Sequence, residues 1–362
     1  MWFVKKVAPL VAVAVSQEVL LHNLETVRRR VGACTVWPVL KANAYGHGLC
    51  EVAKVVADVG VPRVCVDSYY EALMLRRGGL RVPILVIGHS TVEQMVVSRL
   101  RDVVFSVSDS QVIERLVREC RSRIDVHLEV DTGMHRHGVL VNDLEQIARM
   151  VGDSGNIRVV GLFSHFADAD TIDSVMTRKQ LIAWKDAVEI GHQVFPELRE
   201  LHLAATAGIA GRYFYGCTAV RLGIGLYGFD VGVEKMGLLP ALELCTQIVA
   251  LRIIEEGECV GYNGTYVATR RMKIATVPIG YYEGVDRRLS NKGWLYVRGM
   301  RCSIIGRVSM NMTTVDVSDI HDVQIGDEVV MKDIAEMARL CETITYEILV
   351  HIPEHLKRLV VK

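Results

Sequence analysis

Lys41 is the residue whose position most directly suggests chemistry. It stands in the stretch VLKANAYGHG at positions 39–48, where an apolar run gives way to small residues, a tyrosine, a histidine and two glycines. Burying an amine costs free energy, but burial also makes an amine a better nucleophile. A lysine at the end of a buried strand can therefore form an imine with a carbonyl ligand. The alternative is a surface lysine whose stem lies along the protein while its amine stays in water.

Further residues stand just past the ends of other predicted strands. They are Tyr45, Arg136, His165, Thr206, Arg221 and Gly223. Taken singly, each has a structural explanation: His165 could be a hydrogen-bonded core histidine, and Arg221 part of a structural ion pair. Taken together, the Thr206 hydroxyl and the backbone N–H groups of the GIG turn at 223–225 suit a phosphate group. An imine-forming lysine beside a phosphate site predicts pyridoxal phosphate as the cofactor, attached to Lys41.

The elements that must position these residues are indicated by short β-rich runs alternating with segments of helical period. Eight strands are predicted, at 34–41, 62–68, 82–88, 102–107, 123–131, 156–166, 199–205 and 218–223. Eight βα units over about 200 residues are typical of a TIM (β/α)8 barrel, whose active site lies at the carboxyl ends of the strands. The predicted fold class is therefore α/β.

A second domain is predicted after the barrel. The runs at 247–254, 272–281, 294–299, 303–308 and 313–318 follow one another as strands with glycine turns and almost no helix between them. Residues 1–235 are thus assigned to the barrel and residues 236–362 to a mostly-β domain. The start of the chain, MWFVKKVAPLVAVAVSQEV, imitates a signal peptide, but a first strand is favoured because a polar helix follows directly.

The composition of the chain of 362 residues argues against several classes of function. The formal net charge is zero and no long run of like charge occurs, which gives no electrostatic footprint for nucleic acid or for a membrane surface. No apolar segment approaches the length of a membrane span. The nine cysteines are scattered and never spaced as CxxC, which predicts reduced thiols in a cytoplasmic protein and no zinc site.

Several segments together resemble the alanine racemases. KANAYGHG is similar to the pyridoxal-phosphate attachment site of that family, and further segments follow in the family's order over essentially the whole chain. These are DTGMHRHGV, GLFSHFADAD, VRLGIGLYG, GYNGTY, VPIGYYEGVDRRLSNKG, IIGRVSMNM, IGDEVV and TITYE. The resemblance implies a homodimer with shared active sites, in which the barrel carries the cofactor and the β domain of the partner chain completes the site.

The resemblance also implies a role for the candidate residues. Lys41 would hold the cofactor and act as one catalytic base, and Tyr262 from the other chain would act as the second. Two bases are needed because inverting a chiral centre requires proton transfer at both of its faces. Arg136 would contact the cofactor hydroxyl and the substrate carboxylate, and Met310 would lie beside the substrate. The phosphate would be held by Tyr45, Thr206, Gly223, Ile224 and Tyr346.

Arg221 has a particular consequence for the chemistry. The resemblance places it against the pyridine nitrogen of the cofactor, and a guanidinium cannot accept a proton. The ring would then stay neutral, which favours return of a proton to the α-carbon over transamination. His165 is expected to link Arg221 to Tyr262 through hydrogen bonds.

The chain departs from the family pattern near the site. Where many members carry a carbamylated lysine, two residues before DTGM, this chain has Glu129. Because Glu129 supplies the same negative charge, it is predicted to orient Arg136 directly; the alternative is a carboxylate that faces elsewhere. The other departures are Ala205, Thr206, Leu222, Asn311, His135 and His137. The HxH pair has no third ligand in register, so no metal site is predicted.

The expected activity is the interconversion of L- and D-alanine, supplying D-alanine for peptidoglycan. Tyr346 and Met310 would crowd the space for a side chain, which favours a small amino-acid substrate. A racemase that prefers serine or another amino acid is one alternative, and a pyridoxal-phosphate-binding protein without turnover is another. The pairing of Lys41 with Tyr262 argues against the second, since a carrier has no use for a second base.

Overall fold

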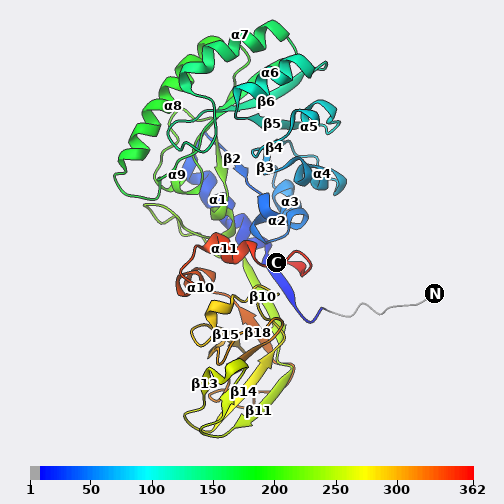
Figure 1. The fold of residues 1–362 in the computed structure, drawn as a ribbon, viewed down its shortest axis with the longest axis vertical. Helices are drawn as coiled ribbons and strands as arrows, with labels where there is room; N and C mark the ends of the chain where they lie inside the picture. The colour runs from blue at the N-terminus through cyan, green and yellow to red at the C-terminus, as the bar shows by residue number, and fades with distance from the viewer. Residues whose placement is uncertain (1–8) are drawn as a thin grey trace, which may run out of the picture. The chain divides into compact units, whose positions relative to one another are not determined.

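The computed structural model describes residues 9–362 and divides into two compact units (Figure 1). The barrel unit comprises Glu18–Ala44 and Leu49–Pro240. The β unit comprises residues 9–17 together with Tyr45–Gly48 and Ala241–Lys362. Each unit is therefore built from stretches that are separated in the sequence.

Eight parallel strands form the wall of the barrel unit. They are β2 (Thr35–Pro38), β3 (Val64–Val66), β4 (Ile84–Val86), β5 (Val103–Val107), β6 (Ile124–Glu129), β7 (Ile157–Phe163), β8 (Glu200–His202) and β9 (Ala219–Leu222). Strands β3 to β8 pair in order, and β2 pairs with β9. The wall closes because Leu40 N donates to Cys65 O at 2.7 Å and Thr218 N donates to Leu201 O at 2.8 Å. The eight predicted strands and the barrel architecture are confirmed.

Helices cover the outer face of these strands (Figure 1). They are α1 (Gln17–Val31), α3 (Leu49–Asp58), α4 (Tyr69–Arg77), α5 (Val92–Val97), α6 (Ser110–Glu119), α7 (Leu144–Ser154) and α8 (Val175–Val194). In α1, Leu20, Leu24 and Val27 are buried at three- and four-residue spacing, as an amphipathic helix requires. At the start of α4, Ser68 and Glu71 form a capping box, which satisfies backbone N–H groups that have no partner within the helix.

Two sheets dominate the β unit. The larger has the order β16-β15-β18-β10-β1-β19 and the smaller the order β11-β14-β17, while β12 and β13 form a separate pair. The strands are β1 (Ala12–Ser16), β10 (Leu242–Gln247), β11 (Ala250–Ile254), β12 (Cys259–Val260), β13 (Tyr266–Val267), β14 (Met272–Val277), β15 (Trp294–Val297), β16 (Met300–Ser303), β17 (Thr313–Asp316), β18 (Glu328–Met331) and β19 (Lys357–Val361). The unit also contains α10 (Ile334–Leu340) and α11 (Thr345–Val350).

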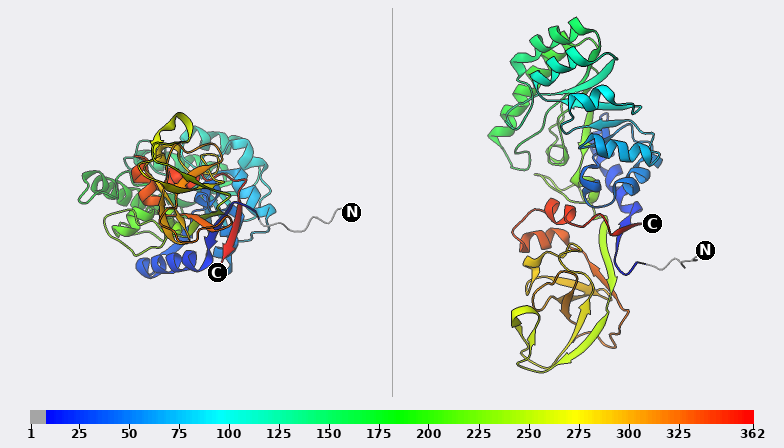
Figure 2. Two further views of the ribbon diagram at one scale, coloured as in Figure 1. Left: turned by 90° about the horizontal axis from the view of Figure 1, so that it is seen from below. Right: turned by 45° about the vertical axis from the view of Figure 1, so that its right-hand side comes forward.

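Two predicted strands differ in the structure. The sequence assigns the first strand to the barrel, but β1 pairs with β10 and β19, and Figure 2 shows β1 in blue beside β19 in red. Residues 1–8, which belong to the same predicted strand, lie outside the described residues. The predicted strand 303–308 is wrong beyond Ser303. There the chain turns at Gly306, whose φ is +75° and where a Cβ would lie 2.7 Å from Val260 O.

Among residues 9–362, no helix combines the length and the apolar composition that crossing a bilayer requires. The nine cysteines are all free thiols. Burial raises the pKa of the Cys65 thiol to about 12, and a thiol with so high a pKa is a poor nucleophile. Cys65 is therefore not a candidate nucleophile.

Candidate active site

Lys41 follows β2 at the carboxyl end of the barrel strands. Just before it, Val39 N donates to Leu222 O at 2.9 Å and Val39 O accepts from the Tyr227 hydroxyl at 2.9 Å, which fixes the end of the strand. The Lys41 amine lies 3.7 Å from Asp67 Oδ1, and the lysine side chain is 40% exposed. The side chain is thus half-exposed rather than buried, and a ligand can reach its amine.

The residues after Lys41 form a left-handed turn without glycine, drawn as α2 in Figure 1. Ala42, Asn43 and Ala44 have φ angles of 53°, 54° and 53°. This conformation costs about 1–2 kcal/mol per residue for L-amino acids. Side chains hold the turn: Ala42 N donates to Glu71 Oε1 at 2.8 Å, and Asn43 Oδ1 accepts from the first residue of α3 at 2.8 Å. Strain of this kind is concentrated at functional sites.

Thr206 lies against the GIG turn, where β8 and β9 end. Thr206 is buried, and its hydroxyl oxygen accepts from Gly225 N at 3.1 Å. A Cβ at Gly225 would lie 2.8 Å from Thr206 Cγ2, so this approach needs glycine. Two short helices begin here, α9 (Thr206–Ala210) and η2 (Ile224–Tyr227). The turn that contains Gly223 and Ile224 therefore lies against Thr206, and backbone N–H groups at the start of a helix suit an anion.

Arg221 is buried in β9, and both of its terminal nitrogens are held. Nη1 donates to His202 Nδ1 at 2.5 Å and to His202 O at 2.8 Å. Nη2 donates to Ser164 O at 2.7 Å and to Leu203 O at 3.0 Å. Burial lowers the pKa of Arg221, although a guanidinium remains charged in proteins. Within residues 9–362 no group accepts from Nε, so this donor suits a ligand acceptor such as the ring nitrogen of pyridoxal phosphate.

His165 is the neighbour of Arg221 at the end of β7. Its Nδ1 accepts from Arg221 Nη2 at 3.2 Å. Burial, followed by the charge of Arg221, lowers the pKa of His165 to about 3. The imidazole is therefore neutral near pH 7 and carries its proton on Nε2, which can donate onward. The sequence predicts a link from Arg221 through His165 to Tyr262. The barrel unit contains its first part, the contact of Arg221 with His165, whereas Tyr262 belongs to the β unit.

Glu129 reaches Arg136 through an intermediate residue, His137. His137 Nδ1 lies 2.8 Å from Glu129 Oε2, and Arg136 Nε donates to His137 Nε2 at 3.2 Å. Because Nε2 accepts, the proton of this neutral imidazole is on Nδ1 and is donated to Glu129. Burial, together with the charge of Arg136, lowers the pKa of His137. A two-step link thus replaces the direct pairing of Glu129 with Arg136 that the sequence predicts.

The loop that carries Arg136 is closed by Asp131. Asp131 Oδ1 accepts from Gly133 N and His135 N at 2.9 and 3.1 Å, and Oδ2 lies 2.9 Å from His135 Nδ1. At Gly138 φ is +121°, and a Cβ there would lie 2.5 Å from Asp131 N. The two histidines of the HxH pair therefore already have carboxylate partners. In the described part of the chain, no group of three or more His, Cys, Asp or Glu residues is arranged to hold a metal.

In the β unit, Tyr262 begins the short helix η3 (Tyr262–Gly264) and is 68% exposed. The turn starts at Gly261, which has a φ of 73° and where a Cβ would lie 3.3 Å from Arg307 N. Met310 is 56% exposed, and its carbonyl accepts from Tyr282 N at 2.9 Å. Both side chains are thus exposed. A turn that begins at a glycine carries Tyr262, and a hydrogen-bonded loop carries Met310.

Asn311, a departure from the family pattern, belongs to the support of the same loop. Its Nδ2 donates to Glu283 Oε1 at 2.7 Å, while Glu283 Oε2 accepts from Gly280 N at 2.8 Å. A Cβ at Gly280 would lie 2.2 Å from Ser309 O, so only glycine allows the two segments to approach. Asn311 therefore fixes the loop that carries Met310.

Tyr45 and Tyr346 both lie in the β unit, with ring centroids 5.9 Å apart. The next residue, Gly46, has a φ of +82°, and a Cβ there would lie 2.2 Å from Leu349 O in α11. Arg358 donates to Gly46 O from Nε at 3.1 Å and from Nη2 at 2.9 Å. Arg358 therefore anchors the segment of Tyr45 to the β unit, a role that was not predicted from the sequence.

Three polar residues inside the barrel, His127, Glu200 and His202, were also missed. A signal for them exists in the sequence. Glu200 and His202 are two residues apart in one strand, and His127 and Glu129 are two apart in another. Side chains at that spacing share one face of a strand, so polar pairs in otherwise apolar barrel strands indicate a buried polar network.

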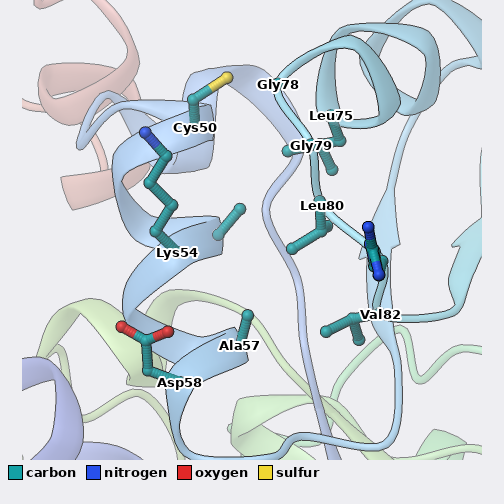
Figure 3. A pocket seen from close by; sticks show the side chains of 11 residues that line it. Cys50, Lys54, Ala57, Asp58, Leu75, Gly78, Gly79, Leu80 and Val82 are labelled. Carbon is teal, nitrogen blue, oxygen red and sulfur yellow. The ribbon is translucent and has the colours of Figure 1, made fainter.

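A pocket between α3 and α4 lies outside this group of residues (Figure 3). Its lining includes Cys50, Lys54, Asp58, Leu75, Leu80 and Val82. None of the candidate site residues contributes to it. The candidate site is therefore defined by the strand ends and not by this pocket.

Comparison with known proteins gives matches over both units. The family model described as "Alanine racemase, N-terminal domain" matches residues 15–231, and "Alanine racemase, C-terminal domain" matches residues 241–360. A curated protein named alanine racemase from Sorangium cellulosum (strain So ce56) is 34% identical, covering 94% of this chain and 96% of its own. Its counterpart from Halothermothrix orenii is 35% identical, covering 94% and 93%. The crystal structure of alanine racemase from Bacillus anthracis with bound L-Ala-P has a TM-score of 0.87 and 28% identity, covering 99% and 96%.

Proposed function

The chain belongs to the alanine racemase family, and on that premise we propose that it interconverts L-alanine and D-alanine with pyridoxal phosphate as cofactor. When bound, this cofactor acidifies the α-hydrogen of an amino acid by drawing electrons from the α-carbon. The family further suggests a cytoplasmic homodimer that supplies D-alanine for peptidoglycan.

Arg221 is the observation that supports the proposal most strongly. Its terminal nitrogens are occupied within the barrel, and the Nε–H donor is left for the ring nitrogen of the cofactor. A guanidinium holds an acceptor without giving up its proton. Arg221 would thus keep the ring neutral and leave electron density at the α-carbon, which favours return of a proton there and so favours racemisation.

Lys41 and Tyr262 are proposed as the two proton carriers. Lys41 would hold the cofactor and would move a proton at one face of the α-carbon of the substrate. Tyr262 of a second chain would move a proton at the opposite face. A second chain is supported by the family resemblance and by the 68% exposure of the Tyr262 side chain, which leaves its hydroxyl accessible to a partner. Tyr281, Tyr282, Met310 and Met312 are among the other large side chains exposed in the same unit.

Arg136 is proposed to bind the substrate carboxylate. Its bond to His137 uses Nε, so Nη1 and Nη2 remain as a fork for two carboxylate oxygens. Thr206, Gly223 and Ile224 are proposed to hold the phosphate, and the family resemblance assigns Tyr45 and Tyr346 to the same group. The contact between the two tyrosine rings supports a joint role for them.

A racemase of the same family that prefers serine or another amino acid is the alternative. The proposal is tested by incubating the purified protein with L-alanine or L-serine in deuterated water. Formation of the D-isomer and incorporation of deuterium at the α-carbon are measured. We expect both with alanine, and a smaller rate with serine. Absence of D-alanine and of deuterium exchange would contradict the proposed function.

The role of Lys41 is tested with a pair of lysine variants. Lys41→Ala should lose the absorbance of lysine-bound cofactor, whereas Lys54→Ala, which changes a lysine of α3, should keep it.

The role of Tyr262 is tested with a pair of tyrosine variants. Tyr262→Phe should lower kcat by about 100-fold or more, the range for loss of a general acid or base. Tyr215→Phe, which changes a highly exposed tyrosine, should not. Wild-type kcat in Tyr262→Phe would remove the second carrier from the proposal.

A further inference from the structure

A chain of hydrogen bonds runs through the interior of the barrel unit from Arg221 to Glu200. Arg221 Nη1 is 2.5 Å from His202 Nδ1, and His202 Nε2 is 2.8 Å from His127 Nδ1. His127 Nε2 is in turn 2.7 Å from Glu200 Oε2. Both histidines are completely buried. Arg221 and His202 thus form only the first link of a longer network.

The groups at the two ends of this hydrogen-bond network determine which ring nitrogen of each histidine carries the proton. A guanidinium can only donate, so His202 Nδ1 must accept and the proton of His202 is on Nε2. That proton is donated to His127 Nδ1, which places the proton of His127 on Nε2, facing the Glu200 carboxylate. Burial lowers the pKa of both histidines, which keeps them neutral. Burial alone would raise the pKa of Glu200, but the hydrogen bond from His127 and the charge of Arg63 lower it below its usual value, so Glu200 is a carboxylate.

The far end of the chain is anchored by Arg63, which precedes β3. Arg63 Nη2 lies 2.8 and 3.1 Å from the two oxygens of Glu200, and its guanidinium lies over the Trp37 ring at 5.0 Å. The Trp37 ring is also 4.8 Å from the His202 ring. Because Glu200 begins β8 while Arg221 lies near the end of β9, the chain crosses the barrel from the amino ends of the strands to the carboxyl ends.

The barrel wall is shaped to admit the two imidazoles. A Cβ at Gly161 in β7 would lie 2.6 Å from His127 Nδ1, so the ring fits only because this residue is glycine. The register between β6 and β7 shifts between Val126 and His127. Phe163 stacks on His202 with ring centroids 5.0 Å apart and an angle of 9°. Both rings are therefore held in one orientation.

We propose that His127 and Glu200 are positioning residues for Arg221, acting through His202 to fix the direction of the Nε–H donor. With the carboxylate in place, His202 can only present an acceptor to Arg221. If the carboxylate is lost, the two histidines can carry their protons on Nδ1. His202 and Arg221 would then turn donors toward each other, and the guanidinium would move. The identity of the ligand at Nε rests on the proposed function, whereas the network itself does not.

The network is tested directly by nitrogen-15 NMR of the holoenzyme labelled at histidine, with signals assigned by His127→Leu and His202→Phe. We expect both histidines to carry the proton on Nε2 and to stay neutral over the pH range in which the protein is folded. A proton on Nδ1 of either residue, or protonation of either ring in that range, would overturn the proposal. This result is independent of whether alanine is the substrate.

The effect on Arg221 is tested with Glu200→Gln, and Glu197→Gln serves as the matched control because Glu197 pairs with Arg158 and Arg123 outside the network. We expect Glu200→Gln to raise the dissociation constant of pyridoxal phosphate by about tenfold, the value of one hydrogen bond to a charged group. It should also raise the pyruvate formed per D-alanine. Pyruvate reports transamination, in which the amino group of alanine passes to the cofactor to give pyridoxamine phosphate.

Glu197→Gln should change neither quantity. If Glu200→Gln does not fold because Arg63 loses its partner, the double variant Arg63→Met, Glu200→Gln removes both charges together. A folded variant of Glu200 with wild-type cofactor affinity and a wild-type ratio of pyruvate to D-alanine would overturn the proposal. If the wild-type enzyme forms no D-alanine, the proposed function fails, and cofactor affinity with the NMR result still decides the role of the network.

Discussion

Glu129 shows how far the surroundings of one residue can move its charge state. It is buried at the end of β6, and burial raises its pKa from 4.5 to about 7. The folded protein therefore binds this proton more tightly than the unfolded chain does. The stability that Glu129 contributes is fully present below pH 4.5 and is lost as the pH rises through about 7. A shift of this size corresponds to roughly 3 kcal/mol.

The variant Glu129→Gln should remove this pH dependence. Relative to wild type, its melting temperature should improve between about pH 5 and pH 8, because the neutral amide never has to ionise in a buried place. Differential scanning calorimetry at several pH values measures the difference. Glu145→Gln, which changes an exposed carboxylate of α7, is the control. Parallel pH curves for Glu129→Gln and wild type would show that Glu129 ionises freely in the folded state.

The two-step link from Glu129 to Arg136 leads to a second prediction. His137→Leu removes the acceptor that holds Arg136 Nε, so the KM for alanine should rise by about 3- to 10-fold with a smaller change in kcat. His135→Leu is the matched control, because His135 contacts Asp131 on the same loop but not Arg136. Steady-state kinetics of the two variants decide the point, and an equal KM for both would argue against the link.

At the scale of elements, the turn at Gly46 depends on two constraints at once. Its φ is +82°, and a Cβ would lie 2.2 Å from Leu349 O, which is backbone and cannot move aside easily. Gly257, in the same unit, has a φ of +87° but open space around it. Gly46→Ala should therefore cost more than about 3 kcal/mol, and Gly257→Ala only about 1–2 kcal/mol. Denaturant unfolding compares them, and equal losses would show that the close contact with Leu349 has no effect.

The elements also show what could be read from the sequence. The barrel strands are runs of Val, Ile and Leu bounded by turns, and the loops that carry the candidate residues lie at the ends of these strands. Strands and loops could therefore be predicted from short stretches of the sequence. The sheet to which Ala12–Ser16 belongs could not, because its partners lie more than 200 residues away. The left-handed turn after Lys41 was likewise hidden, because it contains no glycine and depends on Glu71. The path from Glu129 to Arg136 required the actual positions of the side chains.

At the scale of the whole molecule, the proposed shared site predicts complementation between inactive chains. Lys41→Ala and Tyr262→Ala should each be inactive as purified proteins. When the two are co-expressed, a mixed dimer has one site with both defects and one with neither. Random pairing then restores about a quarter of the wild-type sites, because half of the dimers are mixed. Activity of the co-expressed pair, compared with each variant alone, measures this. No recovery in a pair shown to form mixed dimers would place both residues in the same chain's site.

The position of β1 restricts how this protein can be taken apart. It pairs on one side with β10 and on the other with the edge strand β19, so one interior strand of a sheet made otherwise from residues after 240 comes from residues 12–16. A gene fragment encoding only Ala241–Lys362 would lack that strand and expose two unpaired edges. We therefore expect the C-terminal region not to fold when it is expressed without Ala12–Ser16. A chimaera of two relatives would need a first strand whose side chains fit the sheet of its C-terminal parent.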